Sequence, residues 1–143
     1  MKKLLVSVAT ALSLMTCAYA QSNASNPFIT SSGTLQFAHV DHGFTTTLDQ
    51  QPFDHFVANT LTHFDDIDSR SNTVTRMLVQ TDAGPVLYDF HHRPPLVQRS
   101  NRRMTVKRVF WQDDEVVMQG SQGWFRFKHG EFTALQSSKT IYH

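Results

Sequence analysis

Two short clusters of histidine and aspartate are the residues of this chain best suited to metal chemistry. His39, Asp41 and His42 lie around one predicted turn, and His91 and His92 follow a predicted strand. Imidazole and carboxylate groups are good ligands for zinc, copper or nickel. Both clusters fall at strand ends, so they would meet if those ends shared one edge of a sheet. Their spacing matches no established metal motif, and solvated turn histidines are the simpler interpretation.

A basic segment with two adjacent prolines offers a different chemistry, the recognition of anions. It runs from His91 to Arg103 and carries Arg93, Arg99, Arg102 and Arg103. A guanidinium group donates a fork of N–H bonds that suits carboxylate and phosphate groups. Irregular segments between strands often carry function. We therefore expect a docking surface for a protein partner or an anionic envelope component. A solvated basic rim, partly paired with aspartates, is the alternative.

Trp124 is the aromatic candidate for partner binding. In the run Trp124 to Lys128 the side chains alternate, so that Trp124 would share a strand face with Arg126 and Lys128. Tryptophan is enriched in binding interfaces. The alternative is an ordinary packed aromatic side chain, covered by a helix or by the stems of long cationic residues.

No catalytic residues are assigned. The chain lacks a Gly-x-Ser-x-Gly elbow, a His-Glu-x-x-His pattern, a phosphate loop and a dinucleotide fingerprint. Its one cysteine, Cys17, lies in a predicted signal peptide, so the mature chain has no thiol nucleophile and no disulfide. We expect a non-catalytic binding protein without a cofactor. The alternative is a small metal-binding protein or metal-dependent hydrolase built on the histidine and aspartate clusters.

The first 20 residues have the parts of a secretory signal peptide. Two lysines precede a short apolar run, and Ala18-Tyr19-Ala20 supplies a cleavage site. The run is too short to span a bilayer, so no transmembrane segment remains after cleavage. A lipoprotein modified at Cys17 is a weaker alternative. We expect a periplasmic or secreted protein, with a flexible leader over residues 21–32 and a single domain over residues 33–143.

The charge of the mature chain argues against nucleic acid as a partner. Without Lys2 and Lys3 the 13 cationic residues fall to 11, against 12 acidic ones, and a dedicated nucleic-acid binder is normally basic. The cationic residues all follow Ser69, because residues 21–69 contain no lysine or arginine. Such an asymmetry can be folded inward as ion pairs or displayed as two patches.

Hydrophobic periodicity supplies the expected elements. Residues 34–40 and 44–48 predict one hairpin, and residues 73–80 and 85–90 a second. Residues 49–64 predict a helix, because apolar side chains recur every three or four positions and Pro52 suits a first turn. Residues 65–72 read as a polar loop. Residues 104–135 predict a four-strand meander, since short aromatic and β-branched runs alternate with Asp-Asp, Gly-containing and His-Gly turns.

These elements predict an α+β fold. We expect a curved antiparallel β-sheet of about 7–8 strands, made of hairpins and the C-terminal meander, with one main amphipathic helix packed on one face. The apolar stripe of that helix would comprise Phe53, Phe56, Val57, Thr60, Leu61 and Phe64.

Overall fold

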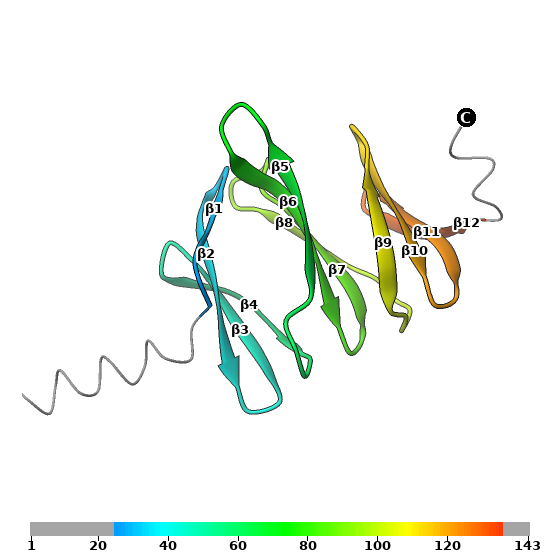
Figure 1. Ribbon diagram of the computed structural model, residues 1–143, viewed down its shortest axis with the longest axis horizontal. Helices are drawn as coiled ribbons and strands as arrows, with labels where there is room; N and C mark the ends of the chain where they lie inside the picture. Colours follow the sequence, from blue (N-terminus) through cyan, green and yellow to red (C-terminus); the bar gives the residue numbers. More distant parts are fainter. Residues whose placement is uncertain (1–24, 136–143) are drawn as a thin grey trace, which may run out of the picture.

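The computed structural model describes residues 25–135, and all regular structure in this part of the chain is β (Figure 1). The predicted signal peptide, its Ala20 cleavage site and the C-terminal residues 136–143 lie outside the described residues. Twelve strands occur between residues 25 and 135: β1 (Phe28–Thr30), β2 (Gly33–Val40), β3 (Gly43–Leu48), β4 (Gln51–Val57), β5 (His63–Asp68), β6 (Thr73–Thr81), β7 (Gly84–Asp89), β8 (Leu96–Arg99), β9 (Val106–Trp111), β10 (Glu115–Gly120), β11 (Gly123–Lys128) and β12 (Glu131–Leu135).

The first sheet is curled. Its strand order is β4-β3-β2-β1-β6-β7-β8, and β5 pairs with β6 beside this path. Neighbouring strands are antiparallel except β1 and β6, which make one parallel pair at Thr30 and Val74. The end of β4 returns to the turn between β6 and β7, where the Asp82 N–H donates to the Val57 carbonyl at 2.8 Å. The curl therefore brings the two terminal strands, β4 and β8, toward each other.

The second sheet is the C-terminal meander, with the order β12-β11-β10-β9. It packs on the face of β6 and β7 that points away from the curl (Figure 1). Consecutive residues of β6 therefore enter different cores: Met77 packs inside the curled sheet and Leu78 packs against the meander, and both are fully buried. A strand buried on both faces reads as a continuous apolar run rather than an alternating one, as residues 77–79 do.

The meander and both predicted hairpins are confirmed. The four predicted strands of residues 104–135 are β9 to β12, and the glycine-containing turns lie between them. His129 and Gly130 both have positive φ angles, 52° and 78°, as a tight two-residue hairpin turn requires. The hairpin of residues 73–90 is β6 and β7, and that of residues 34–48 is β2 and β3.

The predicted helix at residues 49–64, and with it the α+β fold class, is wrong. The single antiparallel sheet is wrong too, because the meander forms a separate sheet and β1 pairs with β6 in parallel. Asp49 and Gln50 form a two-residue turn with φ angles of 50° and 67°, which suits a hairpin rather than a helix start. The chain continues as β4, and a register shift opposite Thr46 and Thr47 gives β4 one additional residue, Phe53. Such a bulge changes the direction of the side chains around it. Phe53 and Phe56 therefore both reach the core, although they are three residues apart, a spacing typical of a helix.

Two predicted loops and part of the predicted leader also contain strands. Residues 63–68 form β5, an edge strand with three aspartates, of which Asp68 is exposed and Asp65 and Asp66 are half-buried. Residues 96–99 form β8 directly after the two prolines. Residues 28–30 form β1, which joins the N-terminal hairpin to the centre of the sheet.

Candidate functional site

Side chains connect β4 and β8, the two terminal strands of the curled sheet, across the seam where no backbone ladder joins them. Asp54 on β4 accepts hydrogen bonds from the Tyr88 hydroxyl on β7, at 2.6 Å, and from the Arg99 guanidinium on β8. The Asp54 side chain is only 6% exposed. A buried carboxylate needs such partners, because an uncompensated charge inside a protein is costly. The three residues therefore fasten β4 to β7 and β8.

Tyr88 has a raised pKa. Its ring is fully buried and packs edge-on against Phe53, with 5.0 Å between ring centroids. Burial is the larger cause of the raised pKa, because it disfavours the phenolate. The hydrogen bond to the Asp54 carboxylate and the negative charge of that group add to it. Tyr88 is thus a constant hydrogen-bond donor to Asp54 over the ordinary pH range.

The basic residues predicted for partner binding have different surroundings. Arg99 pairs with Asp54, and Arg93 donates to the Ser31 carbonyl at 3.0 Å. Arg102 is exposed and lies over the Phe125 ring, with its Cζ 5.1 Å from the centroid. Arg103 is exposed, and its guanidinium has no hydrogen-bond or ion-pair partner among the described residues. Arg103 is therefore the residue of this set that is best placed to accept a ligand.

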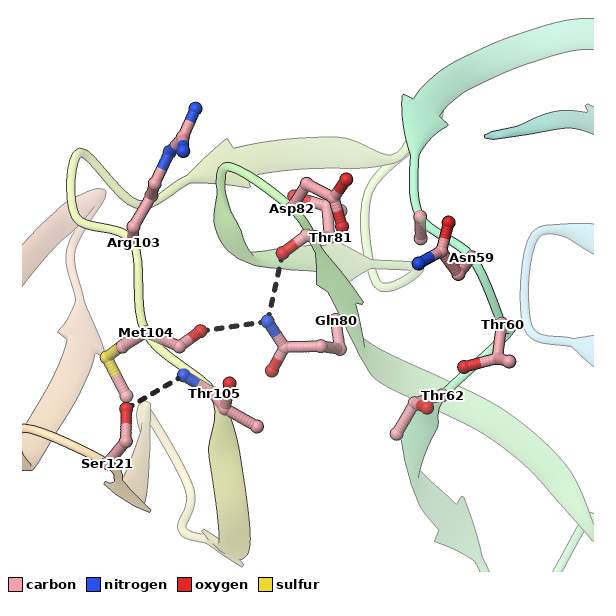
Figure 2. A pocket seen from close by; sticks show the side chains of 11 residues that line it. Asn59, Thr60, Thr62, Gln80, Thr81, Asp82, Arg103, Met104, Thr105 and Ser121 are labelled. Carbon is pink, nitrogen blue, oxygen red and sulfur yellow. Dashed lines mark hydrogen bonds between the residues drawn. The ribbon is translucent and has the colours of Figure 1, made fainter. Parts of the chain in front are cut away.

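A cleft of about 470 Å³ lies at the junction of the two sheets (Figure 2). Its walls come from the connection between β4 and β5, from the turn between β6 and β7, from the connection between β8 and β9, and from the turn between β10 and β11. In Figure 2 Arg103 and Met104 line one side of the cleft, and Asn59, Thr60 and Thr62 line the other.

Gln80 fixes the geometry of this cleft. Its side-chain amide donates to the Met104 carbonyl at 2.8 Å (Figure 2). It also accepts from the Val106 N–H at 2.7 Å. The side chain of Gln80 on β6 thereby holds the start of β9. Gly84, with a φ angle of 120°, lets the turn between β6 and β7 lie under the same connection, because a side chain there would clash with the Arg102 carbonyl.

A second hollow, of about 330 Å³, lies beside the seam. Its lining residues include the apolar Phe56, Val57 and Ala83, of which Val57 and Ala83 are exposed, and the cationic Arg99 and Arg103. The remaining lining residues are His55, Thr81 and Asp82. Thr81, Asp82 and Arg103 line both hollows, so the turn between β6 and β7 separates two hollows that share one unpaired arginine.

The structure does not bring the two predicted metal clusters together. His39 lies near the end of β2, with Asp41 and His42 in the following turn, whereas the start of β2 meets the other cluster: Ser32 Oγ donates to the His92 carbonyl at 3.1 Å. Eight residues of strand separate these ends, roughly 25 Å. Within residues 25–135 no group of three or more histidine, cysteine, aspartate or glutamate side chains is arranged to hold a metal ion.

The histidines of each cluster have local contacts instead. The His39 ring packs edge-on against Phe44, with 5.0 Å between centroids. His91 Nδ1 lies 2.8 Å from an Asp89 carboxylate oxygen. All five residues of the two clusters are exposed.

Trp124 lies on the face of the meander that points away from the curled sheet. Its neighbours Phe125 and Phe127 are buried between the sheets, and Trp124 stacks on Phe110 at 5.7 Å between centroids and an interplanar angle of 26°. Trp124 therefore belongs to a different surface from Arg103, and the two do not form one site.

Two polar residues that hold the sheets together carried no signal in the sequence. Arg76, on the same face of β6 as Gln80, donates to Asp66 at 2.9 Å and to the Gln112 carbonyl at 2.6 Å. Its Cζ lies 5.1 Å from the centre of the Trp111 ring. The periodicity of residues 73–80 marks neither residue, since their partners become visible only when the meander is placed on that face.

Comparisons with protein-family models, with curated proteins and with solved structures find no significant match to this chain. Among the described residues no helix is long and apolar enough to cross a membrane.

Proposed function

We propose that this chain is a small exported, non-catalytic binding protein of the bacterial periplasm, which engages an anionic partner through the connection between β8 and β9. The observation that carries the proposal is Arg103. Its side chain is exposed, its guanidinium has no hydrogen-bond or ion-pair partner within the described part of the chain, and it lines two adjoining hollows, while its carbonyl accepts a hydrogen bond from the Gln122 side-chain amide at 2.9 Å. A guanidinium group in that position can donate a bidentate pair of N–H groups to a carboxylate or phosphate.

The neighbouring residues support binding rather than catalysis. Among the residues that line the two hollows, no serine or threonine hydroxyl is hydrogen-bonded to a histidine or a carboxylate. Activation of a hydroxyl nucleophile requires such a partner within hydrogen-bond reach. The alternative of a metal-dependent hydrolase is not favoured either, because its two clusters lie at opposite ends of β2.

Binding to two defined anionic surfaces tests the proposal. Poly-glutamate on a sensor surface represents an acidic protein, and phosphatidylglycerol vesicles represent the anionic envelope. We expect the protein to bind at least one of them and to release it when salt rises from about 0.01 M to about 0.15 M, because exposed charges are screened. Phosphatidylcholine vesicles are the uncharged control.

Two variants locate the interaction. Replacing Arg102 and Arg103 together with alanine should remove binding, whereas Arg70→Ala, an exposed cation in the turn between β5 and β6, should leave it unchanged. Equal loss in both variants would mean that net charge, not this connection, drives binding. Absence of binding by the unaltered protein to either anionic surface would contradict the proposed function.

The proposed export is tested separately, by the position of the amino terminus. Mass spectrometry of the protein isolated from bacterial periplasm should give Gln21 as the first residue, because the Ala18-Tyr19-Ala20 site precedes it. A lipid-modified Cys17 would instead indicate a membrane-anchored lipoprotein.

A further inference from the structure

The seam between β4 and β8 leaves two strand edges unpaired. These strands are the two ends of the curled sheet, and among residues 25–135 each pairs with a neighbouring strand along one edge only. The bridge between them consists of the Asp54 and Arg99 side chains, not of a backbone ladder. An unpaired edge presents N–H and carbonyl groups in the pattern that an extended peptide can match.

The hollow at this seam has three chemical parts. The exposed side chains of Val57 on β4 and Ala83 in the turn between β6 and β7 form an apolar part. One guanidinium nitrogen of Arg99 donates to Asp54, and the other N–H groups of Arg99 have no partner within the described part of the chain. Arg103 has all its guanidinium N–H groups free of such partners. The hollow can therefore accept one anionic group beside an apolar one.

Asp82 limits how much negative charge the hollow accepts. Its side chain is exposed, makes no ion pair with a described residue and lines the same hollow as the two arginines. With Arg99 partly neutralised by Asp54, a multiply charged ligand such as a phosphate dianion would face this carboxylate without full compensation. A ligand with a single carboxylate and N–H donors beside it fits better, because those donors can face Asp82.

We propose that the seam binds the carboxyl-terminal end of an extended peptide chain with an apolar last residue. The terminal carboxylate accepts hydrogen bonds from Arg103 and Arg99, and the last side chain enters the apolar part of the hollow. The preceding backbone pairs with the free edge of β8, which is four residues long. The proposal rests on the proposed function and names the partner chemistry of the same site.

Fluorescence anisotropy with a labelled peptide tests this inference. The probe is a six-residue peptide of alternating threonine and valine that ends in valine, made as the free acid, as the carboxyl-terminal amide and as a free acid with N-methyl groups at alternate positions. We expect the free acid to bind at least tenfold more tightly than the amide, because the amide carries no charge for Arg103. The N-methylated peptide should bind at least tenfold more weakly than the free acid, because it cannot complete a ladder.

Variants of the two unpaired charges assign the contact. Arg103→Ala should weaken binding of the free acid at least tenfold and leave the amide unchanged, and Arg103→Lys should restore part of the affinity. Asp82→Asn should raise the affinity for inorganic phosphate more than the affinity for the free acid, because it removes the carboxylate that opposes a second negative charge. Arg70→Ala is the matched control and should have no effect. Melting temperatures should stay near that of the unaltered protein, because neither the Arg103 nor the Asp82 side chain has a partner to lose.

The outcomes separate the peptide site from the proposed function. Equal affinities of acid and amide, or no peptide binding, would overturn the peptide site. Retained, Arg103-dependent binding of anionic surfaces would in that case leave the proposed function standing. Competition by 3-methylbutanoate at the affinity of the peptide would identify a small free carboxylate as the ligand and would also overturn the peptide proposal. If Arg103→Ala changes neither peptide nor surface binding, both proposals fail.

Discussion

The Asp54, Tyr88 and Arg99 cluster shows how a single buried carboxylate can close a curled sheet. Its three members come from β4, β7 and β8, and 34 and 45 residues of chain separate Asp54 from its two partners. A hydrogen bond to a charged group contributes about 1.5–3 kcal/mol. Tyr88→Phe should therefore lower the free energy of unfolding by an amount in that range at neutral pH, as measured by chemical denaturation.

The same substitution should change how stability depends on pH. Below pH 10 the tyrosine is protonated in both the folded and the unfolded chain, so its hydrogen bond to Asp54 contributes fully. Above pH 10 the unfolded chain loses the proton while the folded chain keeps it, because burial and Asp54 raise the pKa of Tyr88. The free energy of unfolding should fall as pH rises through this range, and it should fall less in Tyr88→Phe. Parallel curves for the two proteins would show that Tyr88 ionises normally in the folded state.

Arg76 connects the two sheets, as Asp54 connects the two terminal strands of the curled sheet. Its side chain is 10% exposed and contacts Asp66 on β5 as well as the backbone between β9 and β10. Removal of one partner from a buried charged pair costs about 3–5 kcal/mol. Arg76→Ala should cost about 3 kcal/mol, the lower end of that range, because Asp66 remains partly in water. Arg70→Ala should change stability by less than about 0.5 kcal/mol, and equal effects would mean that Arg76 is not an anchor.

At the scale of elements, β4 can be distinguished from the expected helix by two adjacent substitutions. The helical stripe would have buried both Phe56 and Val57, whereas in β4 Phe56 is 7% exposed and Val57 is 56% exposed. Phe56→Ala should cost about 3–5 kcal/mol, and Val57→Ala should cost under about 0.5 kcal/mol. Urea unfolding of both variants measures this difference. A large cost for both would favour the helix.

The strands that the sequence predicts correctly are bounded by residues with strong turn preferences. Asp113, Gly123 and the His129-Gly130 pair mark the ends of the meander strands, and all three mark turns in the structure. Local turn preferences need no knowledge of the rest of the chain. The meander could therefore be predicted from the sequence alone.

The helix prediction failed because three local effects combined into a helical spacing. Phe53 reaches the core through the bulge of β4, Leu61 reaches it from the connection after β4, and Phe64 belongs to β5 and packs against the other core. None of these positions shares a helix face, although their spacing imitates one. A bulge depends on pairing with β3, so periodicity within one segment cannot reveal it.

The candidate site was predictable in part for the same reason. The basic character of residues 91–103 is visible in the sequence, and this segment includes Arg103, which lines both hollows. The pairing of Arg99 with Asp54 depends on the order of the strands in the curled sheet. This order includes the parallel contact between β1 and β6, which joins segments more than 40 residues apart. Such contacts are not encoded in a local pattern.

At the scale of the whole molecule, the two sheets should unfold together. Leu78 and Leu87 extend from β6 and β7 into the core of the meander, while Met77 and Tyr88 on the same strands extend into the core of the curled sheet. Loss of the meander would expose one face of both strands to water and remove the partners of Arg76 and Gln80. Neither sheet can then open without weakening the other, which is the condition for two-state unfolding.

The positions of the tryptophans allow a direct test of this cooperativity. Trp111 and Trp124 lie in β9 and β11, so their fluorescence reports on the meander, whereas far-ultraviolet circular dichroism reports on all strands. We expect one urea transition with the same midpoint by both methods. Leu78→Ala, at a fully buried position in the meander core, should shift both midpoints equally and cost about 2.7–5 kcal/mol. A fluorescence transition that precedes the circular dichroism transition would show instead that the meander unfolds independently, and in that case Leu78→Ala would shift the fluorescence midpoint alone.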